Sequence, residues 1–235
     1  MKPYRLFRTF SIVALFCLLM AGISMSTHAG YTKIRVPASQ EYVYSSDKRP
    51  IIIFVGDSRT MMCTYPKGKQ SARSNYVFCW VNGGNVSVIG NGGSLTSYVE
   101  RMIRKYRDNC VVALNLGVNG NSNPQGNAGR IIQQYRRWMR KHPDVRFFVV
   151  SVNPTRIKTG PFANSKVIAL NKRLKSEFEP EGIYIDTYSV LMESGLVTGS
   201  EKGMRDLAHY NWSAGKKILM TVRKYVSATL AQTIE

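Results

Sequence analysis

The segment IIIFVGDSRTMM, residues 51–62, decides the fold. It begins with five apolar residues, four of which are β-branched. A short continuous apolar run of this kind predicts a strand buried on both faces, as in a parallel sheet covered by helices. The run ends abruptly on Gly56, Asp57 and Ser58. We therefore expect the strand to stop at the edge of a sheet and to present polar groups there.

Short apolar runs alternate with longer amphipathic patterns along the rest of the chain. The expected strands are residues 51–55, 86–89, 111–116, 147–152 and 183–185. The expected helices are residues 95–107, 128–141, 165–178 and 213–228, the last capped by Asn211 or Ser213. This alternation predicts an α/β fold, a three-layer α/β/α sandwich with a five-stranded parallel sheet in the flavodoxin-like order 2-1-3-4-5. Residues 61–81 match no such element, and we expect a loop insertion there with a small hairpin at 76–81.

The first 29 residues have the pattern of a secretory signal peptide. Three basic residues precede an apolar run at 10–23, and small or polar residues lead to Ala29. The run is shorter than the roughly 20 residues that span a bilayer, so we expect cleavage after Ala29, with an uncleaved anchor as the alternative. The expected organisation is a signal peptide at 1–29, an irregular leader at 30–49 and one α/β domain at 50–235. Export predicts a secreted, extracellular or cell-envelope protein without a membrane span after cleavage.

The chain is strongly basic, with 33 Lys and Arg against 14 Asp and Glu and a formal net charge of +19. A positive field of this size favours anionic surroundings, although scattered charges of this kind are more often a solvated basic surface. Export points to an anionic cell envelope as the environment, with its polymers as candidate partners beside an acylated small-molecule or glycan substrate. The basic residues are scattered and match no nucleic-acid-binding motif, so we do not expect nucleic acid as a partner.

Three cysteines remain after the expected cleavage. Cys63 and Cys79 lie in the same connecting region, and an oxidising compartment permits a disulfide between them. Cys110 opens an apolar run and is expected to be a buried free thiol. No cysteine spacing is typical of a metal site, and we expect neither a metal ion nor a cofactor.

Polar residues and glycines follow the expected strands, at the edge where open α/β sheets bind ligands. In chain order they are Ser58, Gly90 to Gly93, Asn119, Asn153 with Arg156, and finally Asp206 with His209. Of the three histidines, His28 leaves with the signal peptide and His142 ends a charged helix. His209 is therefore the candidate catalytic histidine.

These residue types together are typical of acyl transfer to serine. A serine hydroxyl needs an adjacent base, and His209 would take the proton of Ser58 and later return it to the leaving group. Asp206 would hold the imidazole in the required tautomer. The backbone N–H of Ser58, a glycine N–H after the second strand and the side-chain amide of Asn119 would stabilise the oxyanion.

This set resembles the SGNH, or GDSL-type, hydrolases. The blocks GDS, an isolated glycine, GxND and DxxH correspond here to residues 56–58, the glycines at 90–93, residues 117–119 and residues 206–209. Gly120 stands where the third block has aspartate. The resemblance implies an SGNH hydrolase-like domain at 50–235 and ester hydrolysis through Ser58, His209 and Asp206. It also implies an oxyanion hole of the Ser58 N–H, Gly92 or Gly93, and Asn119.

Other residues near these blocks are expected to bind substrate or support the turn. Substrate-binding candidates are Arg59, Asn153, Arg156 and Trp212, while Trp138 is expected in the core. Asn153 also competes for the role of Asn119, and Asp57 is expected to hold the turn without taking part in proton transfer.

The function predicted from these residues is that of an exported serine esterase. We expect it to remove small acyl groups, such as acetyl, from a carbohydrate or cell-envelope substrate. The alternatives are an O-acyltransferase that uses the same site and a non-catalytic basic protein that binds the cell envelope.

Overall fold

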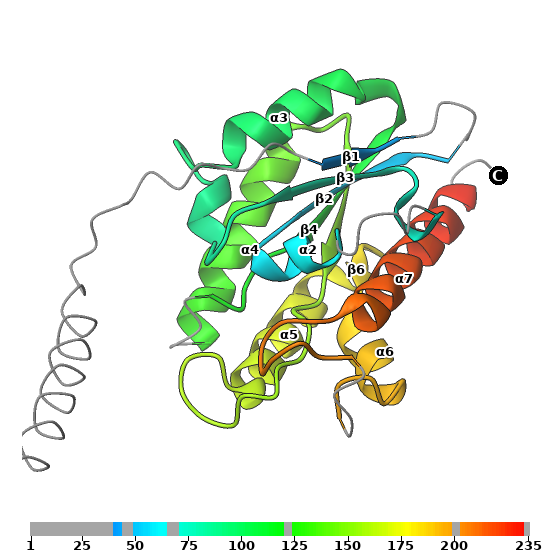
Figure 1. Cartoon of the computed structure of the whole chain (residues 1–235). Helices are drawn as coiled ribbons and strands as arrows, with labels where there is room; N and C mark the ends of the chain where they lie inside the picture. The colour runs from blue at the N-terminus through cyan, green and yellow to red at the C-terminus, as the bar shows by residue number, and fades with distance from the viewer. Residues whose placement is uncertain (1–39, 44–48, 65–70, 120–123, 199–202, 233–235) are drawn as a thin grey trace, which may run out of the picture. The chain divides into compact units, whose positions relative to one another are not determined.

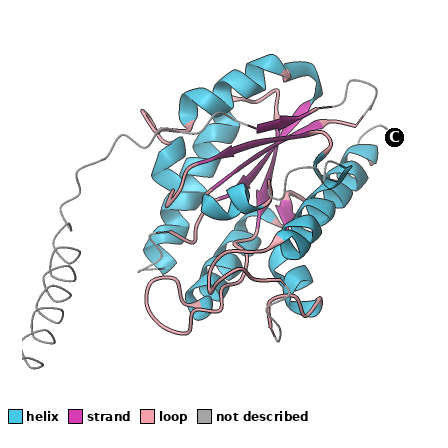
Figure 2. Cartoon of the chain, in the orientation of Figure 1, coloured by secondary structure: helices cyan, strands magenta, loops and turns pink. Residues whose placement is uncertain are grey.

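The computed structural model describes residues 40–43, 49–64, 71–119, 124–198 and 203–232. Within these residues a six-stranded sheet forms the middle layer, in the order β1-β3-β2-β4-β5-β6 (Figures 1 and 2). The strands are β1 (Gln40–Tyr42), β2 (Ile51–Gly56), β3 (Tyr76–Trp80), β4 (Cys110–Asn115), β5 (Arg146–Val150) and β6 (Tyr184–Ile185). Every neighbouring pair is parallel except β1 with β3.

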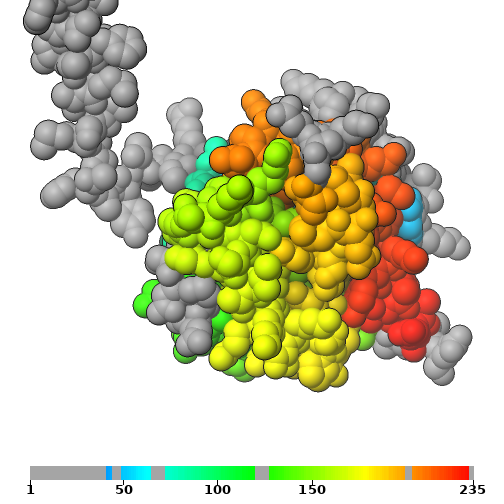
Figure 3. Space-filling view, turned by 90° about the horizontal axis from the view of Figure 1, so that it is seen from below, coloured from blue at the N-terminus to red at the C-terminus, as the bar shows by residue number. Residues whose placement is uncertain are grey.

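Helices cover both faces of this sheet. They are α2 (Ser58–Met62), α3 (Thr96–Lys105), α4 (Pro124–Lys141), α5 (Asn164–Phe178), α6 (Thr187–Glu193) and α7 (Trp212–Ala231). Three single 3₁₀ turns, η1 (Ser71–Arg73), η2 (Val86–Ile89) and η3 (Arg107–Asn109), lie in the connections. Helices α3, α4 and α5 pack on one face of the sheet, and α6 and α7 pack on the other (Figure 1). The space-filling view shows α6 and α7 side by side (Figure 3). The expected three-layer α/β/α sandwich is confirmed.

The central strand β2 shows why its sequence is a continuous apolar run. Ile51, Ile53 and Val55 point into the core shared with α3, α4 and α5. Ile52 and Phe54 point into the core shared with α7. Because successive side chains of a strand point to opposite faces, a strand covered on both faces must be apolar at every position.

The second strand of the sheet is not the one expected from the sequence. Val86–Ile89 forms the turn η2, which begins at Asn85, whose side chain accepts a 2.9 Å hydrogen bond from the Ser87 N–H. The strand is instead Tyr76–Trp80, the segment expected as a hairpin, and all five of its residues are buried between β1 and β2. With β3 as the second strand, the order 2-1-3-4-5 holds.

The sixth strand, β1, lies within the segment expected as an irregular leader. It pairs antiparallel with β3 and forms the outer edge of the sheet, so the sheet is mixed where a purely parallel one was expected. The expected signal peptide lies outside the described residues. In the described part of the chain no helix is both long and apolar enough to cross a bilayer.

The expected disulfide between Cys63 and Cys79 is not formed, and both cysteines are free thiols. Cys63 belongs to the core on the α7 face, whereas Cys79 belongs to the core on the α3 and α4 face. The sheet therefore separates the two sulfur atoms. Cys110 is also free, but it is only partly buried.

Candidate active site

The turn after β2 places Ser58 at the carboxyl edge of the sheet. A Cβ atom on Gly56 would lie 1.9 Å from Oγ1 of Thr60 and 3.1 Å from the carbonyl oxygen of Asn115, so only glycine allows this exit. Asp57 then caps helix α2, and its buried carboxylate accepts a 2.9 Å hydrogen bond from the Arg59 N–H. Ser58 is the first residue of that helix. Asp57 thus holds the turn, as expected from the sequence.

Three of the predicted site residues meet at this edge. Oγ of Ser58 lies 3.0 Å from Nε2 of His209, across 151 positions of sequence. Nδ1 of His209 lies 2.9 Å and 3.1 Å from the two carboxylate oxygens of Asp206. With the proton on Nδ1, the imidazole donates to Asp206 and accepts from the serine hydroxyl.

Asp206 also shapes the loop that carries His209. Its Oδ1 atom accepts hydrogen bonds of 2.8 Å from the backbone N–H groups of Ala208 and His209. Partial burial raises the pKa of the Asp206 carboxyl, but these N–H groups and the imidazole outweigh it and hold the pKa below the usual value. The carboxylate therefore stays ionised beside the histidine at neutral pH.

The residue after the histidine anchors the same loop in the protein interior. The Tyr210 hydroxyl donates a 2.6 Å hydrogen bond to the carbonyl oxygen of Pro154, which follows β5. Two residues after Pro154, the N–H of Arg156 donates a 2.8 Å hydrogen bond to the carbonyl oxygen of Leu207. These bonds join the loops after β5 and before α7, so His209 faces Ser58 from a supported backbone.

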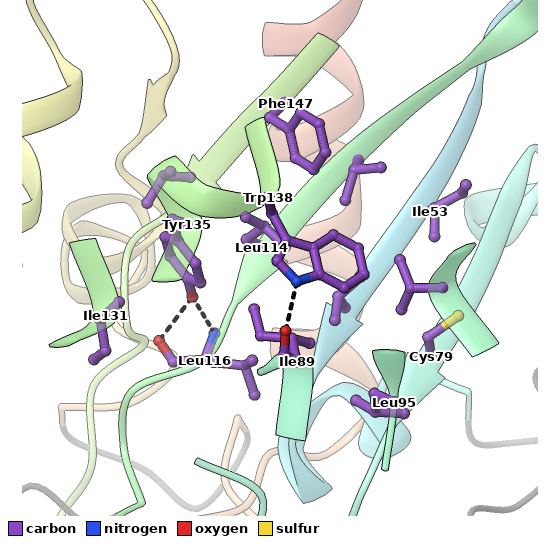
Figure 4. Packing of buried hydrophobic residues seen from close by; sticks show 14 of the residues in the cluster. Ile53, Cys79, Ile89, Leu95, Leu114, Leu116, Ile131, Tyr135, Trp138 and Phe147 are labelled. Atoms are coloured by element: carbon purple, nitrogen blue, oxygen red, sulfur yellow. Dashed lines mark hydrogen bonds between the residues drawn. The ribbon is translucent and has the colours of Figure 1, made fainter. Parts of the chain in front are cut away.

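Asn119 approaches the site on a sharp turn after β4. Gly117 in this turn has a φ of +142°, and a Cβ atom there would lie 2.8 Å from Cγ2 of Val152. The Tyr135 hydroxyl accepts from the Leu116 N–H and donates to the Leu116 carbonyl, at 3.0 Å and 3.2 Å (Figure 4). The Asn119 amide donates a 2.9 Å hydrogen bond to the carbonyl oxygen of Gly84. This bond joins the Asn119 turn to the loop after β3.

A cavity of about 600 Å³ opens where these loops meet. Ser58, Asp206, His209 and Asn119 all line it, so the structure brings these four predicted residues together. Gly83 also lines it, three residues after the end of β3, with a φ of +67°.

The glycines expected in the oxyanion hole lie elsewhere. Gly92 and Gly93 line another surface pocket, together with Glu100 and Lys141. They follow η2 instead of a strand, and so they are not carried to the edge that holds Ser58. The glycine that lines the cavity together with Ser58 is Gly83. The sequence does contain a pair of glycines shortly after Trp80, at Gly83 and Gly84. They become candidates for this edge only when the strand that ends at Trp80 is recognised as the second strand of the sheet.

Two of the four expected substrate-binding residues are buried in structural roles. The Arg59 side chain is 2% exposed, and its guanidinium donates a 2.8 Å hydrogen bond to the carbonyl oxygen of Asn153. Asn153 is 1% exposed and accepts a 2.7 Å hydrogen bond from the Thr187 hydroxyl. Arg59 borders the cavity, but its hydrogen bonds hold its guanidinium in the interior.

The other two expected substrate-binding residues are not among the residues that line the cavity. Arg156 is exposed on the loop after β5. Trp212 begins α7, where the Arg73 guanidinium lies 5.1 Å from the centre of its ring. Trp138, in contrast, is buried in the core as expected, with its indole N–H bonded to the Ile89 carbonyl (Figure 4).

The cavity lining includes residues that the sequence analysis did not single out. Val118, Ile157 and Phe162 are apolar lining residues from the loops after β4 and β5. Met62 and Arg205 also line the cavity, and Nη1 of Arg205 lies 3.9 Å from the sulfur of Met62. No sequence motif marks these residues, because their side chains meet only through folding. Among the described residues, no group of three or more His, Cys, Asp or Glu side chains is arranged to hold a metal ion.

Comparison with known proteins gives structural matches only. No protein-family model and no curated protein sequence matches the chain. One similar structure is a member of the lipolytic G-D-S-L family from Veillonella parvula, at 15% identity and a TM-score of 0.56, which covers 74% of this chain and 96% of that one. A second is the catalytic domain of peptidoglycan O-acetyltransferase A from Streptococcus pneumoniae, at 13% identity, a TM-score of 0.53 and coverage of 78% and 96%.

A third similar structure is an acetylxylan esterase from Geobacillus stearothermophilus, at 10% identity and a TM-score of 0.51, with coverage of 75% of this chain and 94% of that one. At these identities the likeness establishes the fold.

Proposed function

We propose that this chain, which has the SGNH hydrolase fold, is a serine esterase that removes small acyl groups through Ser58, His209 and Asp206. The observation that carries the proposal is the 3.0 Å approach of the Ser58 hydroxyl to Nε2 of His209, with Asp206 on the other ring nitrogen. This arrangement is a catalytic triad, in which a carboxylate orients a histidine base and the base activates a serine hydroxyl for nucleophilic attack on an ester.

The first half of the reaction forms an acyl-enzyme. Oγ of Ser58 bonds to the ester carbonyl carbon while its proton passes to Nε2 of His209. The carbonyl oxygen becomes an oxyanion near the Ser58 N–H, the Gly83 N–H and the Asn119 amide. When the intermediate collapses, the bond to the alcohol oxygen breaks, and that oxygen takes the proton from His209.

The second half returns the enzyme to its starting state. A water molecule gives a proton to His209 and attacks the acyl carbon, and the acyl–Oγ bond then breaks. Oγ takes the proton back, and the acid leaves. Asp206, whose pKa lies below the usual value, keeps its negative charge and stabilises the imidazolium in both halves.

The apolar lining of Val118, Ile157 and Phe162 supports a small acyl group as the part of the substrate that is transferred. Two of the similar structures are named for acetyl chemistry on polysaccharide or peptidoglycan. The signal-peptide pattern and the net charge of +19 support an exported enzyme that works among anionic envelope polymers. A mature N-terminus at Gly30, read from protein exported by a bacterial host, would test the export step.

The direct test is hydrolysis of 4-nitrophenyl acetate, followed by mass spectrometry of the trapped acyl-enzyme. Wild type should turn over the ester and carry the acyl group on Ser58, whereas Ser58→Ala should do neither. Ser97→Ala, an exposed change on α3, is the matched control and should behave as wild type. Equal turnover by Ser58→Ala and wild type would contradict the proposal.

Acyl transfer is the second candidate function, since one similar structure is named as an O-acetyltransferase. The same acyl-enzyme would then be intercepted by a sugar hydroxyl instead of water. Adding soluble acceptor oligosaccharides to the ester assay separates the two functions. An esterase releases free acetate in proportion to ester consumed, whereas a transferase yields acetylated acceptor in its place.

A further inference from the structure

Arg205 precedes Asp206 in the chain and lines the cavity together with the proposed catalytic groups. Its side chain is exposed, and its Nη1 atom lies 3.9 Å from the sulfur of Met62, at the end of α2. Its backbone N–H donates a 2.8 Å hydrogen bond to the carbonyl oxygen of His209. The guanidinium is therefore attached to the same short loop as the proposed base.

The other charges that line the cavity already have partners inside the protein. The Asp206 carboxylate accepts from the His209 ring and from two backbone N–H groups. The Arg59 guanidinium lies against the buried Asp57 carboxylate, with 3.4 Å between Nε and Oδ1. Among the described residues, no carboxylate lies within ion-pair distance of Arg205. The lining thus carries one positive charge that the described residues do not neutralise.

We propose that Arg205 forms a subsite for a carboxylate on the alcohol part of the substrate. The inference rests on the proposed esterase function and names its substrate class as acyl esters of acidic alcohols, such as acidic sugars. A guanidinium donates two parallel N–H groups to a carboxylate, a geometry that neither Lys nor a neutral side chain reproduces. The apolar lining from Val118, Ile157 and Phe162 receives the acyl group, and Arg205 receives the charged remainder.

Two acetyl esters that differ in one carboxylate test this subsite. They are 4-nitrophenyl acetate and 5-acetoxy-2-nitrobenzoate, which release the same type of nitrophenolate. The measured quantity is the ratio of kcat/KM for the anionic ester to that for the neutral ester. Changing Arg205→Gln should lower this ratio about fivefold, the effect expected of one partly solvated ion pair. Arg205→Glu should lower it further, because the new charge repels the carboxylate.

Salt and a matched variant control for general effects of charge. Arg173→Gln removes an exposed arginine on α5, outside the cavity lining, and should leave the ratio unchanged. Raising the ionic strength should lower the wild-type ratio and leave that of Arg205→Gln almost constant, since salt screens exposed charges. Equal ratios for wild type and Arg205→Gln would overturn the subsite.

A binding measurement separates this inference from the proposed function. Calorimetric titration of Ser58→Ala with 5-acetoxy-2-nitrobenzoate needs no turnover, and adding Arg205→Gln should weaken the affinity about fivefold. If wild type hydrolyses neither ester but binding still depends on Arg205, the subsite stands and the esterase function fails. If both esters are hydrolysed and neither readout depends on Arg205, the esterase function stands and the subsite fails. Arg205→Lys, measured alongside, should recover only part of the ratio and the affinity.

Discussion

The Arg59 guanidinium donates a 2.8 Å hydrogen bond to the carbonyl oxygen of Asn153, across 94 positions of sequence. The same side chain contacts the Asp57 carboxylate at 3.4 Å and the Tyr210 hydroxyl at 3.3 Å. Asp57 and Arg59 flank Ser58, and Tyr210 follows His209. The buried Arg59 side chain thus links the two residues that flank the proposed nucleophile to the loop that carries the proposed base.

We expect Arg59→Lys to lower kcat by at least tenfold with a smaller change in KM. A lysine ammonium is a single point of charge and cannot contact Asp57, Asn153 and Tyr210 in the geometry of the guanidinium. Arg59→Met should also lower the free energy of unfolding by about 3–5 kcal/mol, because it leaves the buried Asp57 carboxylate without its charged partner. Denaturant titration and steady-state kinetics measure the two effects. Wild-type kcat in Arg59→Lys would contradict the positioning role.

Gly83 and Gly92 provide a matched pair for locating the oxyanion hole. Both have positive φ angles, +67° and +71°, and a Cβ atom on either would meet nothing within 4 Å. Alanine at either position should therefore cost a similar 1–2 kcal/mol or so of unfolding free energy through backbone strain. Only Gly83→Ala should lower kcat/KM, because only Gly83 lines the cavity with Ser58. Equal activity losses in both variants, measured with 4-nitrophenyl acetate, would argue against this assignment.

The amide of Asn119 allows a test that involves no backbone change. Asn119→Ala removes a donor from the cavity and the 2.9 Å hydrogen bond to the Gly84 carbonyl. We expect kcat to fall about 10²–10³-fold, as when one donor of an oxyanion hole is lost, with KM changed far less. If KM rises and kcat is retained, Asn119 contributes to ground-state binding instead.

Replacing Asp206 should disable the proposed base without removing it. In Asp206→Asn the amide no longer holds the Nδ1 proton in place, so we expect kcat to fall by about 10⁴-fold. Asp108→Asn, an exposed change in η3, is the control and should keep wild-type kcat. A loss of less than tenfold in Asp206→Asn would argue against the assigned role.

The same carboxylate should make a small, pH-dependent contribution to stability. The pKa of Asp206 in the folded protein lies below its ordinary value of 3.8, so the folded state favours the ionised form. Its contribution is therefore present above about pH 4 and is lost as the pH falls through the folded-state pKa. The difference in unfolding free energy between wild type and Asp206→Asn should shrink from pH 7 to pH 3, as measured by denaturant titration at each pH. A difference that grows toward pH 3 would contradict the direction of the shift.

The three described thiols should differ in reactivity. Burial raises the pKa of Cys63 and of Cys79 to about 12, and that of the half-buried Cys110 to about 11. In the folded protein we expect iodoacetamide to modify Cys110 first, and all three equally after denaturation. Peptide mass spectrometry identifies the modified site. A Cys63–Cys79 disulfide in the non-reduced digest would contradict the separation of these thiols by the sheet.

The misplaced second strand and the misplaced glycine share one cause, whereas the role of Arg59 was missed for another reason. The segment VSVI at 86–89 has the residue pattern of a strand, but the edge of β2 with which it would pair is occupied by β3, Tyr76–Trp80. Placing the second strand too late led to Gly92 or Gly93 as the expected donor, whereas the glycine that lines the cavity with Ser58 is Gly83. Arg59 was assigned to the substrate because it follows Ser58, yet its side chain turns toward the buried Asp57.

The sequence by itself determined the α/β architecture and the set of Ser58, Asn119, Asp206 and His209. Apolar runs and amphipathic periods are local properties of the chain, and short motifs remain visible wherever they occur in it. Only the tertiary structure decided which glycine lines the cavity, why Arg59 is buried and why Arg205 faces the cavity. The first depends on which strand pairs with β2, and the other two depend on contacts of Arg59 with Asn153 and of Arg205 with Met62. No local pattern in the sequence shows these contacts, because they join residues that are far apart in the chain and form only on folding.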